Sequence, residues 1–201
     1  MKITSIKQQE RLKNRYSIFV DEKYVFSLST DALLEQQLAS GQELDEAQLK
    51  AYKKLSQDDK AYGLSLAYVA RRMRSIGELN DYFRRKQYEP DLAEQILAKL
   101  AKNGWVDDEK FAEAWVRNRR LLKNSSKRRL QQELKAKKVA DEIIQKVLAT
   151  DEQNDQQMLQ ELVEKKRRIA RYNDNQKLMQ YLARQGFSYD DIKSALADTH
   201  N

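Results

Sequence analysis

The sequence contains no cysteine, one proline and five glycines among 201 residues. Without cysteine it forms neither disulfide bonds nor zinc–thiolate sites. Its only histidine is His200, so the members of a Ser-His-Asp or Cys-His catalytic arrangement are lacking. The glycines are too scattered for a phosphate loop or a dinucleotide-binding fingerprint. These shortages predict that the protein is not an enzyme and that it holds no metal ion and no cofactor.

Long apolar runs are also missing. No segment approaches the length of a membrane span, and the first residues, MKITSIKQQERLK, lack the apolar stretch of a signal peptide. Proline and glycine, which most often interrupt helices, are rare. We therefore expect a cytoplasmic protein that makes no membrane contact and is built from long, solvated helices.

Charge, by contrast, is abundant: 34% of the residues are charged, and the formal net charge is +7. The charge lies in blocks of alternating sign. Residues 117–138 carry ten basic side chains and one acidic side chain, residues 139–164 are mainly acidic, and residues 165–171 (KKRRIAR) are basic again. The positive net charge favours an anionic partner, either a nucleic acid or an acidic protein surface.

The N-terminal residues have the pattern of a small sheet. RYSIFVDEKYVFSLS (15–29) contains two β-rich runs around the polar turn Asp21-Glu22-Lys23, and ITSIKQ (3–8) supplies a third strand. This pattern predicts a hairpin with one added strand. After Ser29 the sequence is helical almost to its end, with the first helices predicted at 31–38, 44–55 and 60–73.

A repeat then follows. Residues 75–100 and 126–149 align without a gap at a shift of 51, so that Leu79 falls on Leu130 and Ile96 on Val147. Residues 176–197 align at a further shift of 48. Each copy is a helix, a short turn and a second helix, and a third helix follows the first two copies, at 107–122 and 154–172. The matches span both helices and the turn, which chance alignment of amphipathic helices does not explain.

The predicted fold is mainly α: tandem three-helix repeats in an extended, curved array, with a small N-terminal β-hairpin or sheet region. We place the N-terminal region at 1–58, the first repeat at 59–122 and the second at 123–172. A third, shortened repeat occupies 173–201.

The acidic stretch at 107–109 raises the question of catalysis, but it fits the start of a helix. Gly104 ends the preceding helix, and Asp107 caps the next one. Asp108 and Glu109 fill the first turn, where the helix dipole favours negative charge, and Val106 and Phe111 have the spacing of a hydrophobic staple. We expect a structural motif made of Gly104, Trp105, Asp107, Asp108, Phe111 and Trp115. Trp105 and Trp115 are assigned to the core, and Leu122 continues the apolar face of Phe111 and Trp115.

Two groups of basic side chains are the candidates for partner binding. They are Arg71, Arg72, Arg74, Arg84, Arg85 and Lys86 in the first copy, and Arg117, Arg119, Arg120, Lys127, Arg128 and Arg129 around the turn Asn124-Ser125-Ser126. Such clusters grip phosphates or acidic patches of a protein, whereas many charge runs are solvated faces without a partner. A platform that stacks the bases of a single strand requires aromatic side chains between the basic ones. These two groups do not have that pattern.

These motifs resemble the RecX family, which are small regulators of the RecA recombinase. The resemblance covers residues 60–197 and rests on Arg71, Arg74, Ser75, Glu78, Leu79, Gly104, Asp107, Asp108, Phe111, Ala112, Trp115, Val116, Arg119, Arg129, Leu130, Leu134, Lys137, Gly186, Phe187, Asp190 and Ile192. The N-terminal hairpin resembles the extension of longer members from Gram-positive bacteria. Two turns depart from the family's pattern, because Asn124-Ser125-Ser126 and Lys137-Lys138 stand where glycine is usual.

The resemblance implies a cytoplasmic, non-enzymatic protein of DNA repair, homologous recombination and the SOS response. It implies binding to the RecA–DNA filament and a mostly negative effect on its ATPase, strand-exchange and co-protease activities. Single- or double-stranded DNA is a further expected partner, and the chain is expected to be a monomer. The residues themselves leave open an alternative, a stand-alone nucleic-acid-binding helical repeat protein.

Overall fold

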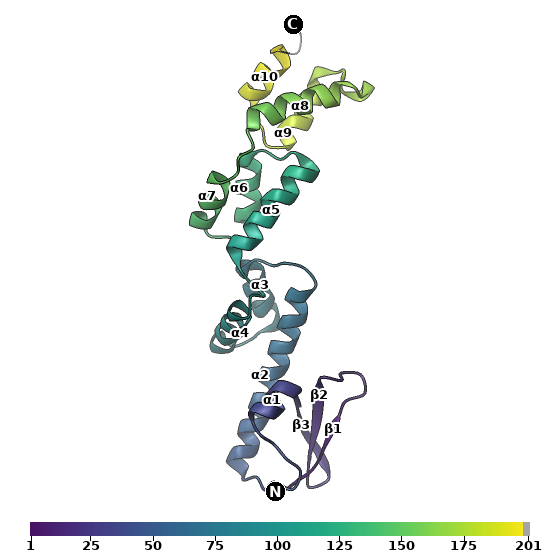
Figure 1. Cartoon of the computed structure of the whole chain (residues 1–201), viewed down its shortest axis with the longest axis vertical. Helices are drawn as coiled ribbons and strands as arrows, with labels where there is room; N and C mark the ends of the chain where they lie inside the picture. The colour runs from purple at the N-terminus through teal and green to yellow at the C-terminus, as the bar shows by residue number, and fades with distance from the viewer. Residues whose placement is uncertain (199–201) are drawn as a thin grey trace. The chain divides into compact units, whose positions relative to one another are not determined.

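The computed structural model describes residues 1–198, which form two compact units. One unit contains residues 1–72 and 83–105, and the other contains residues 73–82 and the chain from residue 106 onward. Figure 1 shows the elements in chain order. His200 and the end of the predicted third repeat, 199–201, lie outside the described residues.

The N-terminal unit begins with an antiparallel sheet of order β1-β2-β3, formed by β1 (Ile3–Gln8), β2 (Arg15–Val20) and β3 (Lys23–Ser29). A two-residue loop joins β2 to β3, and its residues Asp21 (φ 47°) and Glu22 (φ 66°) both have positive φ. Two such residues give the loop the twist of a type I′ turn, which matches the twist of the strands. The predicted hairpin and third strand are confirmed.

Helices α1 (Thr30–Glu35), α2 (Glu46–Ala70) and α4 (Pro90–Lys102) complete this unit, and α2 packs along β3 (Figure 1). The sequence predicted two helices where the single helix α2 runs. Its polar middle does not break the helix, because those side chains bind the sheet instead. Asp59 accepts hydrogen bonds from the Arg15 guanidinium at 2.8 Å and from the Ser29 N–H at 2.9 Å, and the Ser56 hydroxyl donates to the Ser27 carbonyl at 2.6 Å.

The second unit contains two three-helix groups, each with its own core. Helices α5 (Asp108–Lys123), α6 (Lys127–Ala136) and α7 (Asp141–Ala149) share one core, and α8 (Asp155–Arg167), α9 (Asn175–Arg184) and α10 (Tyr189–Asp198) share the other. A short 3-10 helix, η1 (Ala170–Tyr172), precedes α9, and α3 (Ile76–Lys86) spans the boundary between the two units. The mainly α fold with tandem three-helix groups is confirmed, whereas the predicted boundaries at 59, 123 and 173 stay a prediction.

Equivalent turns confirm the spacing of the repeat. Gln87, Lys138 and Gly186 stand at successive shifts of 51 and 48, and their φ angles are 54°, 58° and 93°. Each ends the first helix of a copy in the left-handed region, which glycine adopts most readily. Asn124, with φ 48°, ends α5 in the same way. The turns therefore keep the repeat geometry although glycine stands at only one of the three repeat positions.

Two residues assigned to the apolar core lie at the surface. Trp105 is 47% exposed and Leu122 is 80% exposed. Leu122 follows Trp115 by seven positions, which brings a helical residue back to a similar face. The exposure of Leu122 shows that, within residues 1–198, this face is left largely uncovered at the end of α5. Trp115 itself is partly buried and packs against the α5–α7 core, as predicted.

Candidate partner-binding surface

The acidic stretch at the start of α5 serves the backbone. The Asp107 carboxylate accepts hydrogen bonds from the N–H groups of Glu109 and Lys110, at 3.0 and 3.1 Å, which confirms it as the N-cap. Backbone hydrogen bonds to Lys110 hold the pKa of Asp107 below its ordinary value, against the effect of its slight burial. Among residues 1–198, no group of three or more His, Cys, Asp or Glu side chains could hold a metal ion.

Asp108 has a role that the sequence does not indicate. Its side chain is buried, and it accepts a hydrogen bond from the Ile76 N–H at 2.7 Å, at the start of α3. Burial raises the pKa of this carboxyl. Asp155, in the first turn of α8, makes the equivalent bond to the Lys127 N–H at 2.8 Å, at the start of α6. A residue in the first turn of α5 thus caps α3, and a residue in the first turn of α8 caps α6.

A second pair of contacts repeats at the same junctions. The Ser75 hydroxyl donates to the Lys137 carbonyl at 2.6 Å, and the Ser126 N–H donates to the Gln185 carbonyl at 3.0 Å. Ser75 and Ser126 are buried and occupy equivalent positions of the repeat, as do Lys137 and Gln185. Equivalent residues therefore meet at both junctions, although the hydroxyl is the donor at one and the backbone N–H at the other.

Arg120 does not belong to an exposed basic face, so its assignment to partner binding is corrected. Its side chain is 2% exposed and is paired with Asp151 at 2.5 Å and with Asp155 at 2.8 Å. It also donates to the Ser125 carbonyl at 2.8 Å. A buried guanidinium requires such complete pairing, because an unpaired charge in the interior is costly. Arg120 ties α5 to the first turn of α8.

Arg119 and Arg129 are half-buried and share one internal carboxylate. Glu133 accepts from Arg119 Nε at 2.6 Å, from Arg129 Nε at 3.1 Å and from the Trp115 indole N–H at 2.9 Å. The Arg119 guanidinium also lies 4.4 Å from the Trp115 ring. Desolvation raises the pKa of Glu133, but the hydrogen bonds from Arg129, Arg119 and Trp115 outweigh it and hold the pKa below its ordinary value. Glu133, the only acidic side chain among residues 117–138, therefore holds Arg119 and Arg129 in place.

This network makes part of the stability sensitive to acid. Because the pKa of Glu133 is lower in the folded than in the unfolded state, its contribution is present above the unfolded carboxyl pKa of about 4.3 and is lost as the pH falls through the folded value. We expect Glu133→Gln to be less stable than the parent at neutral pH and to lose less stability between about pH 5 and pH 3. Urea unfolding followed across this range measures both effects. Glu152→Gln, at an exposed position, controls for removal of one charge, and parallel curves for the parent and Glu133→Gln would contradict the assignment.

The exposed members of the second basic group are Arg117 and Arg128, and Lys127 is half-buried, with its ammonium bound to the Asp151 carbonyl at 3.0 Å. Arg117 and Leu121 are four residues apart on α5 and line a groove of about 500 Å³, together with Val116 and Val147. Leu121 and the adjacent Leu122 are 72% and 80% exposed. We call Arg117, Leu121, Leu122 and this groove the α5 surface. The exposed leucines are a feature that the sequence had placed in the core or left unassigned.

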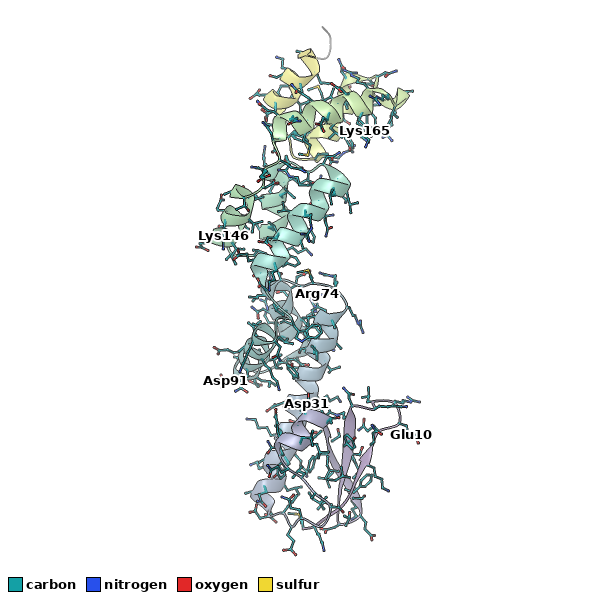
Figure 2. All side chains as sticks on the ribbon, viewed as in Figure 1. Glu10, Asp31, Arg74, Asp91, Lys146 and Lys165 are labelled. Carbon is teal, nitrogen blue, oxygen red and sulfur yellow. The ribbon has the colours of Figure 1, made fainter. Side chains whose placement is uncertain are left out.

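The first basic group lies between α2 and α4. Arg71, Arg72, Arg84, Arg85 and Lys86 are exposed, and Arg74 is half-buried in the segment that joins α2 to α3 (Figure 2). Arg84, Arg85 and Lys86 occupy the last turn of α3, where cations also suit the helix dipole. These residues keep their predicted place at the surface, and their role in binding stays a prediction.

In residues 1–198 no helix is long and apolar enough to cross a membrane. Fold and surface together define a class: a tandem three-helix repeat protein with an N-terminal sheet, joined by repeated polar junctions. Four domain models of one family match successive parts of the chain. The regulatory protein RecX N-terminal domain matches residues 1–45, and the first, second and third three-helix domains of RecX match residues 61–100, 107–148 and 153–196. The chain belongs to the RecX family of regulatory proteins.

Individual relatives agree with this assignment. The regulatory protein RecX of Listeria monocytogenes serovar 1/2a is 32% identical over 205 residues, which cover 98% of this chain and 76% of the Listeria protein. That of Bacillus licheniformis is 32% identical over 202 residues, or 98% of this chain and 77% of its own. A crystal structure of regulatory protein RecX superposes with a TM-score of 0.75 at 28% identity, covering 98% of both chains. RecX from Lactobacillus salivarius gives 0.58 at 25% identity over 70% of this chain and 95% of its own.

Proposed function

We propose that this protein binds the RecA–DNA filament in the cytoplasm and restrains its ATPase, strand-exchange and co-protease activities. In this proposal it acts as a monomer, without a cofactor and without catalysis of its own. Membership of a family of regulatory proteins supports a regulatory role. The specific partner follows from the resemblance to regulators of RecA. The exposed basic residues of both groups contribute the positive surface for it.

The observation that carries the proposal is the composition of the α5 surface. Leu121 and Leu122 are largely exposed near Arg117. The adjoining groove has walls of mixed character, with Val116 and Val147 as well as Glu113 and Asp151. A phosphate backbone offers no partner for adjacent leucines, whereas a protein surface with an apolar pocket and carboxylates accommodates both the leucines and the arginine. Two adjacent leucines exposed beside a groove favour a contact with another protein over a purely electrostatic contact with phosphates.

The repeated junctions support a partner with repeated subunits. Ser75 and Ser126 occupy equivalent positions of the repeat and bond to the equivalent carbonyls of Lys137 and Gln185, so related modules follow one another along the chain. Such a chain can contact neighbouring subunits of a polymer, and simultaneous contacts raise the overall affinity without any single strong contact. A partner in the form of a filament fits this arrangement better than a single small protein does.

The α5 surface can be tested by replacing its leucines. We expect Leu121→Ser with Leu122→Ser to raise about tenfold the concentration that half-inhibits single-strand-DNA-dependent ATP hydrolysis by the cognate RecA, since interface anchors of this kind are worth about 1–2 kcal/mol or more. Binding to bare DNA should not change. The matched control is Leu12→Ser with Leu34→Ser, which removes two leucines that are 55% and 69% exposed in the N-terminal unit.

Two results would count against this interface. Inhibition by the α5 double variant that equals inhibition by the parent places the interface elsewhere. Equal losses of inhibition in the α5 variant and in the control would show a general effect of removing exposed leucines.

Arg129 is not a suitable probe of the interface, because a glutamate at this position would stand beside Glu133 and disturb the fold.

The alternative function is binding to nucleic acid without a recombinase. The exposed arginines Arg117 and Arg128 favour it, because they have no carboxylate within ion-pair distance among the described residues. The titration of RecA-dependent ATP hydrolysis at fixed salt, with DNA in excess, separates the two functions. Inhibition well below one protein per RecA subunit favours the filament. Absence of inhibition, under conditions where the protein binds bare DNA, favours the alternative.

A further inference from the structure

The basic segment KKRRIAR (165–171) covers the end of α8 and the turn that follows it. Two of its cations, Lys166 and Arg167, contact other residues of the α8–α10 group. The Lys166 ammonium lies 4.6 Å from the Tyr181 ring centre and 5.6 Å from that of Tyr172. Arg167 donates to the backbone carbonyls of Tyr172 and Asn173, at 3.2 and 3.1 Å, and to the Asn175 side chain. These contacts hold the turn between α8 and α9 in one conformation.

The remaining three cations of the segment point to a different use. Lys165, Arg168 and Arg171 are exposed, and no carboxylate of residues 1–198 forms an ion pair with them. Lys165 lies in the last turn of α8 (Figure 2), and Arg168 follows it by three residues, on the same helix face. Arg171 follows Arg168 by three residues, and its guanidinium is 5.9 Å from the Tyr172 ring, which Lys166 also contacts at the end of α8. We call these three residues the α8 cluster.

The helix dipole does not account for the whole cluster. Cations in the last turn of a helix are stabilising, which explains Lys165. Arg168 is the C-cap, and Arg171 lies beyond the helix, in η1. The like charges of Lys165, Arg168 and Arg171 repel one another. Glu161 and Glu164 precede Lys165 and Arg168 by four residues on α8, but within residues 1–198 they form no ion pair with them. A bound anion would reduce the remaining repulsion.

We propose that the α8 cluster binds the phosphate backbone of a nucleic acid, without reading its sequence. Arginine forks match phosphate oxygens, and the turn that carries them is already ordered by Arg167. The two tyrosine rings of the site contact Lys166 and are partly buried, so they do not provide a base-stacking platform. Ile169 is 45% exposed and is the one apolar side chain between the cations, which is too little for the apolar centre of a protein interface.

This site goes beyond the proposed filament function, because it assigns nucleic-acid binding to residues of α8 and η1 that neither basic group contains, and its test uses the protein alone, without RecA. The variant is Lys165→Gln with Arg168→Gln and Arg171→Gln, and the probe is a fluorescent oligodeoxythymidylate. Each phosphate neutralised on a single strand contributes about 0.7 to the slope of log affinity against log salt, so the slope should fall by about two. Affinity at about 0.1 M salt should fall about a hundredfold.

A matched control removes the same charge elsewhere. Lys110→Gln with Lys135→Gln and Lys146→Gln removes three exposed lysines that pair with Asp107, Asp141 and Glu109. This control should keep a slope close to that of the parent. Arg168→Lys with Arg171→Lys should also keep the slope, because the charges remain. Far-UV circular dichroism verifies that each variant is folded.

Three outcomes overturn the proposal. The first is an unchanged slope in the α8 variant. The second is an equal fall in the lysine control, which would reduce the effect to net charge. The third is retention of oligonucleotide binding together with loss of binding to polyglutamate, which would assign the cluster to an acidic protein. None of these outcomes depends on RecA, so the proposed filament function stands or falls by its own experiment.

Discussion

Replacing Arg120 with methionine should destabilise the second unit by about 3–5 kcal/mol. The methionine fills much of the same space, but it leaves the Asp151 carboxylate, whose side chain is 8% exposed, without its cation. An uncompensated buried charge costs more than the lost packing. Asp155 loses its partner as well, although it keeps the bond from the Lys127 N–H. The Arg120 guanidinium thus adds ion pairs to the backbone hydrogen bonds that link helices α5–α7 to helices α8–α10.

Urea unfolding followed by the fluorescence of Trp115 measures this loss, because Trp115 packs against the α5–α7 core. Trp105 is 47% exposed and can be replaced by phenylalanine to remove its signal. Arg117→Met, three residues earlier on the exposed side of α5, is the matched control and should change stability by less than about 0.5 kcal/mol. Adding Asp151→Leu to Arg120→Met should recover much of the loss. A loss below about 1 kcal/mol for Arg120→Met would show that water replaces the guanidinium.

The second large loss of stability is expected at Gly186, where the α8–α10 group meets α6. Gly186 has φ 93°, and a Cβ atom there would lie 2.5 Å from both the Arg129 Cβ and the Ser126 hydroxyl. Gly186→Ala therefore combines the strain of a left-handed alanine, about 1–2 kcal/mol, with an overlap that costs about 1–3 kcal/mol. Since the nearest atoms belong to α6, the overlap should loosen the junction between the two groups.

Two other glycines separate these effects. Gly104 also has positive φ, 74°, but a Cβ there would meet nothing within 4 Å. Gly104→Ala should therefore lose only the conformational part, about 1–2 kcal/mol. Gly63 lies within α2 with open space around it, so Gly63→Ala should gain about 0.5–1 kcal/mol. Thermal or urea unfolding of the three variants gives the order directly. Equal losses at Gly186 and Gly104 would mean that the junction yields without cost.

The helix starts and the repeat were predictable because their causes are local. Asp107 caps α5 and Ser188 caps α10, each through bonds that span at most three residues. The alignment of Gln87, Lys138 and Gly186 was predictable from the apolar spacing alone, and all three have the left-handed backbone that a helix-ending turn requires. Asn124 and Lys138 adopt this conformation without glycine, at a modest energetic cost that the contacts around them outweigh.

The candidate site was predicted less well, because exposure of a charged side chain depends on what lies opposite it. Arg117 and Arg120 are three residues apart and look alike in the sequence, yet one is exposed and the other is 2% exposed. The difference lies in Asp151 and Asp155, which are about thirty residues away in the chain and reach Arg120 across the junction. In the same way, Leu122 shares its spacing with the partly buried Trp115 but is 80% exposed.

The sequence by itself determined the start of α5, its cap and the period of the repeat, since each follows from backbone hydrogen bonding and apolar spacing within a few turns. It did not determine every helix boundary, because the polar middle of α2 is held by the sheet. Only the tertiary structure decided which cations are free. Arg119, Arg120 and Arg129 are held by internal carboxylates. Within residues 1–198 no carboxylate holds the exposed cations Arg117, Arg128, Lys165, Arg168 and Arg171. The physical reason is that burial and ion pairing arise between residues distant in the chain, where the period of a helix carries no information.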